Sequence, residues 1–320
     1  MTFVHSERKV FEILRILKEQ QEPIGAKRLS ELMADRGFVL SDRAVQYYLS
    51  YLDEIGFTRK VGNRGRILTE KGRTETESAL VETRIGYIIS RLERLAFRTT
   101  FDPQTGTGDV AYNLSLVPTD QADEVAAIFE QVARAGFGFF SAYSTITLDP
   151  RIHPGTTGFI TVCSITMDGV LQRRGIPVRM VYGGRLGVTG GHPGEFQDLI
   201  GYHGTTADPL ELLIDAGLTS VNDAVSGKSG VVLANVREVP YPARDRVEET
   251  AARMRDAGFR FPVTMGTGVM NLPGDPHRLS VVSYSGMNLI AAAAEKGFVL
   301  ENEIGAGTIP FDRFRSVSTP

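Results

Sequence analysis

The sequence has a single cysteine, no tryptophan and no long apolar run. Cys163 alone among 320 residues excludes an intramolecular disulfide framework and a cysteine-rich zinc site. No apolar stretch approaches the length that spans a bilayer, and the amphipathic N-terminus carries acidic residues, unlike a secretory signal or a transit peptide. The histidines show no paired spacing typical of a metal site. We therefore expect a cytoplasmic protein with no metal, no cofactor and no membrane partner.

The charge is distributed unevenly along the chain. Residues 1–74 carry 14 Lys/Arg against 10 Asp/Glu, whereas the remainder carries 21 against 28, within a net charge of -3. A basic N-terminal end on an acidic body indicates that a polyanion meets the N-terminus.

The first 75 residues predict a winged helix-turn-helix. Three amphipathic helical patterns follow one another, and Ser41 is a typical N-cap for the third of them. Gly37 and Gly56 are expected to end the second and third helices. Residues 57–73 then alternate, turn at Gly62-Asn63-Arg64-Gly65 and alternate again, which predicts a β-hairpin.

This order places the third helix in the major groove of DNA and makes the basic hairpin the wing. Exposed side chains at the start of the helix would meet base edges, and the wing would contact phosphates or the minor groove. We predict DNA contacts from Ser41, Arg43, Gln46, Tyr47, Arg59, Lys60, Arg64 and Arg66. The alternative is a winged helix that docks a protein.

Residues 109–320 contain an internal duplication. The stretch from Asp109 aligns without a gap with the stretch from Val231, at an offset of 122 residues. Each copy predicts a strand, a helix that ends in Ala-Gly-Phe, a second strand, a short helix and a further strand. We therefore predict an α/β (α+β) domain of two pseudo-symmetric lobes, and a ligand often lies between such lobes. A glycine-rich hairpin and the stretch Tyr202 to Gly217 lie in an uncopied insert, roughly residues 183–229.

The insert contains a strong helix start. Asp208, Pro209 and Glu211 occupy the N-cap, first and third helical positions of a capping box. The preceding Gly204-Thr205-Thr206 offers hydroxyls and backbone amides beside that helix start, which suits an anion.

Polar residues elsewhere could complete such a site. If residues 162–169 form a strand, Ser164, Thr166 and Asp168 share one face; the alternative for Asp168-Gly169 is a turn. Arg237 could bind a carboxylate or pair with a nearby acid.

Cys163 leaves an enzymatic alternative open. It could act as a nucleophile with a histidine base, although the favoured interpretation is a small buried hydrophobic side chain in a strand. An enzyme acting on a small carboxylate metabolite is thus the alternative function. The sequence shows no convincing nucleophile-base or metal constellation, so we predict a protein that is not an enzyme.

Several long motifs resemble the NrpR regulatory-domain family, which are repressors of nitrogen-assimilation genes with an N-terminal winged helix. The motifs are VCSITMDGVLQRRGIPV, YGG, LIGYHGTTADPLELLIDAGLTSV, ANVREVP and GMNLIAAAAEKG. The resemblance covers nearly the entire chain. It implies a homodimeric DNA-binding repressor whose regulatory domain senses 2-oxoglutarate, a dicarboxylate effector.

The resemblance also implies an effector site, carried over motif by motif. Its residues are Cys163, Ser164, Thr166, His203, Gly204, Thr205, Thr206, Asp208, Arg237 and Glu238. The family is expected to have an acidic residue before Gly-Thr-Thr, where this chain has His203, whose imidazole would favour an anion or introduce pH sensitivity near neutrality.

The chain is therefore expected to have three parts. Residues 1–75 form the DNA-binding domain, residues 76–108 a connector helix and linker, and residues 109–320 the effector-binding and dimerisation domain. The expected partners are a double-stranded DNA operator, a second copy of the chain and a small dicarboxylate.

Overall fold

The computed structural model describes residues 3–20, 22–78, 87–147, 149, 151–152, 154–205 and 207–314. The chain forms two compact units, Met1–Ile85 and Gly86–Pro320. Among the described residues, no helix is long and apolar enough to cross a membrane.

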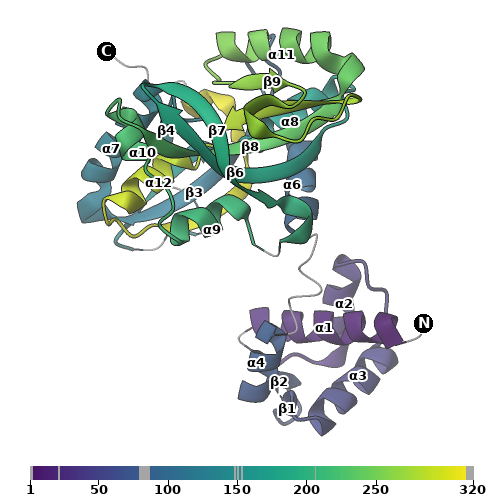
Figure 1. Cartoon of the computed structure of the whole chain (residues 1–320). Coiled ribbons are helices and arrows are strands. Elements are labelled where there is room, and N and C mark those ends of the chain that lie inside the picture. Colours follow the sequence, from purple (N-terminus) through teal and green to yellow (C-terminus); the bar gives the residue numbers. More distant parts are fainter. Residues whose placement is uncertain are drawn as a thin grey trace. The chain divides into compact units, whose positions relative to one another are not determined.

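The first unit has the predicted order of helices followed by a hairpin (Figure 1). One apolar face of each helix enters a shared core, which includes Ile13, Leu29 and Val45. Gly37 and Gly56 have positive φ angles just beyond the second and third helices, as expected of helix-ending glycines. The elements are α1 (Phe3–Glu19), α2 (Ala26–Asp35), α3 (Asp42–Glu54), β1 (Thr58–Lys60), β2 (Arg66–Leu68) and α4 (Glu70–Ser78).

The second unit contains two antiparallel sheets with strand orders β11-β3-β5-β4 and β7-β6-β8-β10-β9. The first repeat comprises β3 (Asp109–Pro118), η1 (Thr119–Gln121), α7 (Ala122–Ala135), β4 (Tyr143–Ile146), β5 (Thr156–Val162), α8 (Ile165–Arg173) and β6 (Arg179–Thr189). The second comprises β8 (Gly230–Pro240), η3 (Tyr241–Ala243), α11 (Arg244–Asp256), β9 (Thr264–Gly266), η4 (Val269–Asn271), β10 (Arg278–Tyr284), α12 (Asn288–Glu295) and β11 (Glu301–Pro310). The remaining elements are α6 (Tyr87–Arg98), β7 (His192–Gly201), η2 (Tyr202–Gly204), α9 (Pro209–Asp215), α10 (Val221–Val225) and η5 (Phe311–Phe314).

The two repeats exchange their last strands. β6 of the first repeat pairs with β8 of the second, and β11 of the second pairs with β3 of the first. The repeat offset holds closely, since β5 and β10 begin and end 122 residues apart. Because β6 is the counterpart of β11, the uncopied insert begins after β6 rather than near residue 183. The predicted glycine-rich hairpin is the β6–β7 pair.

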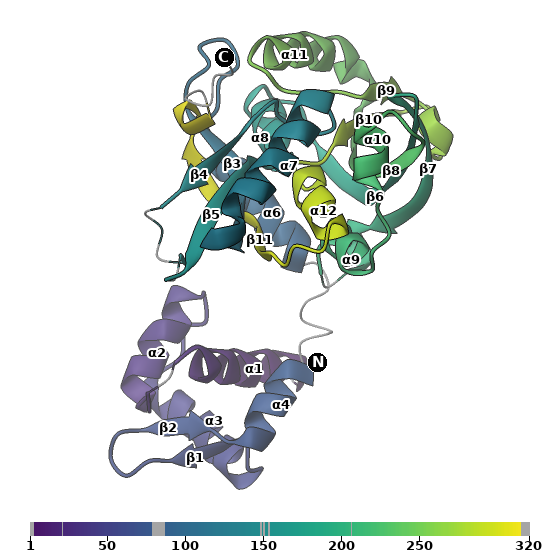
Figure 2. The ribbon, with the colours of Figure 1, turned by 90° about the vertical axis from the view of Figure 1, so that its left-hand side faces the viewer.

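The hydrophobic core also joins the two repeats. One apolar cluster combines α7 of the first repeat with α12 of the second, and another combines α8 with α11. Figure 2 shows α7 lying over β3 and β5 with α12 beside it. Neither repeat therefore has a core of its own, and the second unit must fold as one body.

The expected connector is divided between the two units. α4 begins at Glu70, inside the stretch expected to complete the hairpin, and residues 79–86 lie outside the described residues. α6 packs its apolar side against residues of the second unit, including Ala111 and Ile165. The structure thus groups residues 87–108 with the second unit.

The stretch at residues 162–169 is neither a strand nor a turn. β5 ends at Val162, Ser164 precedes α8, and Asp168 and Gly169 lie within that helix. Residues 165–171 are all buried, so the helix shows no polar face that could have distinguished it from a strand. A Cβ atom on Gly169 would lie 2.5 Å from the carbonyl oxygen of Ala96, which makes glycine a requirement for the close packing of α8 on α6.

We predict that Gly169→Ala destabilises the protein although alanine favours helices. The overpacking should cost about 1–3 kcal/mol, against a helix-propensity gain of at most about 1 kcal/mol. Urea unfolding followed by circular dichroism would measure the difference. Gly204→Ala is the control, because nothing lies within 4 Å of a Cβ atom there. Equal midpoints for the two variants would show that α6 does not pack as described.

Candidate functional site

The start of α3 presents a polar, exposed face in the first unit. Ser41 caps the helix, since its hydroxyl oxygen accepts a hydrogen bond from the Ala44 amide at 3.3 Å. Tyr47 is 73% exposed, which is unusual for a large aromatic side chain without a partner surface. Tyr51, one turn further along the same face, is 48% exposed and was not predicted. The exposed residues that sequence analysis predicted on this face are Arg43, Gln46 and Tyr47.

The cations predicted in the wing differ from one another in exposure. Arg59, Lys60 and Arg64 are exposed. Arg66 is not free for a phosphate, because its Nε donates to Asp53 Oδ2 of α3 at 2.7 Å and its side chain is only 17% exposed. The Thr58 hydroxyl donates to the other Asp53 oxygen at 2.6 Å. Arg66 therefore holds the wing against the recognition helix, whereas the exposed cations remain available.

The second unit contains a small cavity where the two repeats meet. Its volume is about 10 Å³, and it is lined from the β5–α8 junction (Cys163, Ser164), the start of α9 (Asp208) and β8 (Asn235, Arg237). The remaining wall is completed by α6, η2, β11 and the β10–α12 junction. A cavity of this size has room for about one water molecule.

Arg237 is the cation of this cavity. Its side chain is fully buried, and its Nε and Nη2 donate to Asp168 Oδ1 and Oδ2, both at 3.0 Å. Nη2 also approaches the Ser164 hydroxyl at 3.3 Å, whereas Nη1 has no hydrogen-bond partner among the described residues. Burial disfavours the charge, but the Asp168 carboxylate holds the Arg237 pKa above its usual value. A buried ion pair is costly, so an unused donor on it is a candidate ligand contact.

Hydrogen-bonded polar groups surround the guanidinium. The Tyr202 hydroxyl donates to Asn235 Oδ1 at 3.0 Å, and Asn235 Nδ2 donates to the Ser164 hydroxyl at 3.2 Å. Asp208 caps α9 as predicted, accepting from the Leu210 amide at 2.9 Å, and burial raises its pKa. The cavity is thus a polar network whose groups orient one another.

The hydrogen bonds that form the framework of the cavity occur in both repeats, whereas its ion pair occurs only once. The amides of Cys163 and Ser285, which are equivalent in the two repeats, donate to the carbonyls of Ala111 and Leu233 respectively. Thr166 and Asn288 are also equivalent. The Thr166 hydroxyl accepts a hydrogen bond from the Ala111 amide, and Asn288 Oδ1 accepts one from the Leu233 amide. These contacts occur twice. The ion pair occurs once, because the counterparts of Arg237 and Asp168 are Ser115 and Ile290.

The structure brings together some of the predicted effector residues and leaves others outside the cavity. Cys163, Ser164, Asp208 and Arg237 line it. Glu238 faces the opposite side of β8 and pairs with Arg179 at 3.2 Å, as alternation along a strand requires.

The other predicted residues have local roles or lie on the surface. The buried Thr166 holds Ala111, and the Thr205 hydroxyl forms a turn by donating to the carbonyl of Ala207 at 2.7 Å. His203 and Gly204 are exposed, and Thr206 lies outside the described residues.

Sequence reasoning missed several lining residues. Asn235 had a signal, because it recurs with Asn113 in the duplication. Leu92 had none, since it lies on α6, outside the expected boundary of the domain. The other missed lining residues are Ile165, Tyr202, Leu210, Ser285, Met287 and Ile304.

Cys163 does not have the properties of a nucleophile. Burial raises the pKa of its thiol to about 12, so the reactive thiolate is scarce at neutral pH. Within the described part of the chain, no group of three or more His, Cys, Asp or Glu residues could hold a metal ion.

Comparison with known protein families identifies the chain. The family model described as NrpR regulatory domains NRD1 and 2 matches residues 85–316. The chain belongs to the NrpR family. A second model, the ribonuclease R winged-helix domain, matches residues 11–76.

The similar curated proteins are all named as regulators. The chain is 36% identical over 301 residues to the global nitrogen regulator NrpRI of Methanosarcina mazei, covering 92% of this chain and 93% of that protein. It is 29% identical to the global nitrogen regulator NrpR of Methanococcus maripaludis, covering 91% of this chain and 52% of that protein. It thus spans about half of that relative. This NrpR-family chain is a nitrogen-responsive transcriptional regulator and not an enzyme.

The fold of the regulatory unit has a solved counterpart. A crystal structure of a nitrogen repressor-like protein from Methanococcus jannaschii matches with a TM-score of 0.60 and 22% sequence identity, covering 70% of this chain and 96% of that chain. The likeness supports the same fold for the NrpR-type unit.

We predict that removing Arg237 alone destabilises the protein more than removing Arg237 and Asp168 together. Arg237→Ser leaves Asp168 as an unpaired buried acid and should lower the free energy of unfolding by about 3–5 kcal/mol. Adding Asp168→Ile, which gives both positions the residues of their repeat counterparts Ser115 and Ile290, should restore most of that loss. Guanidinium unfolding of the single and double variants would measure both effects. A double variant no more stable than the single one would contradict this account.

Proposed function

We propose that the chain is a DNA-binding repressor whose regulatory unit senses 2-oxoglutarate and thereby links nitrogen status to gene expression. The observation that carries the effector part is the fully buried Arg237, whose Nη1 lacks a partner among the described residues at the wall of a polar cavity. A carboxylate is the natural acceptor for such a donor.

DNA binding is supported by the first unit. The exposed side chains at the start of α3 suit base edges, and the exposed wing cations suit phosphates. Ser41 contributes as a helix cap, and Arg66 contributes by holding the wing to α3. The DNA contacts proposed here are therefore Arg43, Gln46, Tyr47, Arg59, Lys60 and Arg64.

We expect the double variant Arg59→Gln/Arg64→Gln to weaken binding to all duplexes alike. Each lost phosphate contact should reduce the slope of log K against log salt by about 0.9. The measurement is fluorescence anisotropy from low to moderate salt, on a duplex that the unmodified protein selects from a random pool. The control is Arg134→Gln, a surface arginine of the regulatory unit. An unchanged slope in the wing variant would favour protein docking by the winged helix instead.

The effector proposal assigns one carboxylate of 2-oxoglutarate to Arg237, with the Ser164 hydroxyl beside it. Loss of a charged hydrogen bond of about 1.5–3 kcal/mol corresponds to a roughly 10- to 150-fold weaker affinity. Arg237→Ser/Asp168→Ile should show this loss by calorimetry, and its folding can be checked independently. Absence of heat when 2-oxoglutarate is titrated into the unmodified protein would refute this effector.

We also propose that the repressor acts as a homodimer. Two recognition helices would then address the two halves of a palindromic operator, as two-fold symmetry allows. Sedimentation velocity with and without operator DNA measures the assembly.

A further inference from the structure

The starting observation is an irregular segment of β11 at the cavity. The register between β11 and β3 shifts between Glu303 and Gly307, and we call residues 303–307 the β11 bulge. Ile304, within the bulge, is 5% exposed and lines the cavity. A bulge leaves part of the ladder of hydrogen bonds between the two strands unmade.

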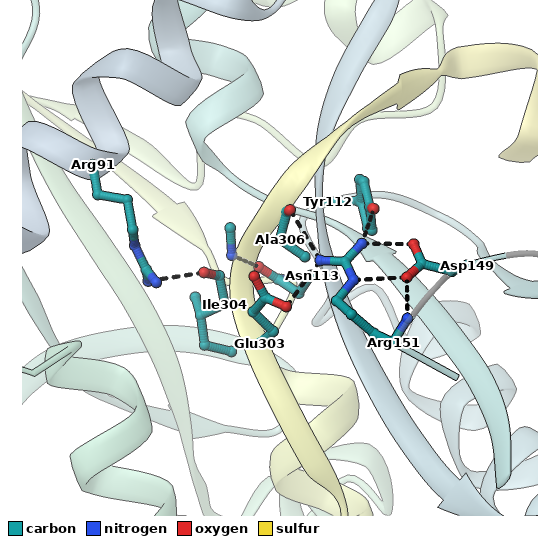
Figure 3. Close-up of polar contacts among 9 residues, drawn as sticks. Arg91, Tyr112, Asn113, Asp149, Arg151, Glu303, Ile304 and Ala306 are labelled. Atoms are coloured by element: carbon teal, nitrogen blue, oxygen red, sulfur yellow. Dashed lines mark hydrogen bonds and ion pairs between the residues drawn. The ribbon is translucent and has the colours of Figure 1, made fainter. Parts of the chain in front are cut away.

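Side chains from separate parts of the regulatory unit hold the bulge (Figure 3). Arg91 Nη2 of α6 donates to the Ile304 carbonyl at 2.9 Å. The Gly305 amide donates to Asn113 Oδ1 of β3 at 3.1 Å. Arg151 Nη1 donates to Glu303 Oε2 at 2.9 Å and to the Ala306 carbonyl at 3.1 Å. The bulge is therefore fixed to α6 on one side and to the first repeat on the other.

α6 and the bulge are also in close apolar contact. A Cβ atom on Gly305, which has a φ of +61°, would lie 3.0 Å from Leu95 and 3.4 Å from Leu92. Arg91 precedes Leu92 on α6, and its hydrogen bond to the Ile304 carbonyl connects α6 to the bulge. Leu92 and Ile304 both line the cavity. In the sequence, α6 is the first described element after the unit that contains the winged helix.

The size of the cavity requires its walls to move when a ligand enters. About 10 Å³ accommodates roughly one water molecule, and a dicarboxylate is several times larger. Asn235 and Arg237 lie on β8, which is paired on both sides and is therefore a rigid wall. Among the other walls, the bulge is the one that interrupts a strand, and α6 contacts it directly, so we assign the displacement to these two.

We propose that Arg91 couples the effector cavity to the segment that leads to the winged helix. A ligand that occupies the cavity displaces Ile304, and the hydrogen bond from Arg91 carries that displacement into α6. The narrow and widened cavities are the two states, and the ligand favours the widened one by differential contact. This inference rests on the proposed effector function, because it describes how that same site is read.

The test is Arg91→Met, which keeps an extended apolar side chain and removes the donor. The matched control is Arg94→Met, on an exposed position of the same helix. Three quantities are measured: the Kd for 2-oxoglutarate, the operator Kd without it, and the factor by which saturating 2-oxoglutarate changes the operator Kd. In Arg91→Met the coupling factor should fall close to one from a typical range of about 5- to 150-fold, with both Kd values within about threefold of the unmodified protein. An undiminished factor overturns the inference.

A second variant tests the coupling from the cavity through Arg91 to α6 without any ligand. Ile304→Phe enlarges a lining side chain and should widen the cavity in place of the effector. It should change the operator Kd, and addition of Arg91→Met should abolish that change. If Ile304→Phe leaves the operator Kd as it was, the inference is wrong whatever the effector is. If only the titration with 2-oxoglutarate fails, the proposed effector is wrong and the coupling route stands.

Discussion

The regulatory unit depends on the exchange of one strand between its two repeats. β6 and β11 each complete the sheet of the other copy, and the apolar clusters combine helices from both copies. The exchange brings the junctions after β5 and β10 together so closely that a Cβ atom on Gly286 would lie 2.3 Å from the Val162 carbonyl oxygen. The cavity lies at this meeting point, so the topology determines where the cavity forms.

The duplicated scaffold carries a charge that is not duplicated. Thr166 and Asn288 hold equivalent strands in the two repeats, but Arg237 of the second repeat and Asp168 of the first have no charged counterparts. A symmetric cavity would accept a ligand in two equivalent orientations. The single guanidinium removes that equivalence, so the proposed ligand with an acidic end would be held in one orientation relative to α6 and β11.

The sequence predicted the features that have local signals. Helix caps at Ser41 and Asp208 and the basic wing follow from residue types a few positions apart, and the repeat follows from a constant offset. The strand exchange has no local signal, because pairing between distant segments leaves no trace in either one.

The surroundings of some predicted site residues differ from the sequence expectation for identifiable physical reasons. The buried α8 imitates a strand because every residue from 165 to 171 is inside. The Thr205 hydroxyl is used by its own turn, and the Arg66 guanidinium by Asp53. Whether a polar side chain bonds within the protein or stays available to a ligand depends on tertiary geometry.

The strand exchange also orders events during synthesis of the chain. β6 is made before β8, so their hairpin-like pairing can begin as soon as β8 leaves the ribosome. β3 must wait much longer, because the partner of Val110 is Ile309 near the end of the last strand. Until then one edge of β3 is an unpaired strand edge, which is open to association with other chains.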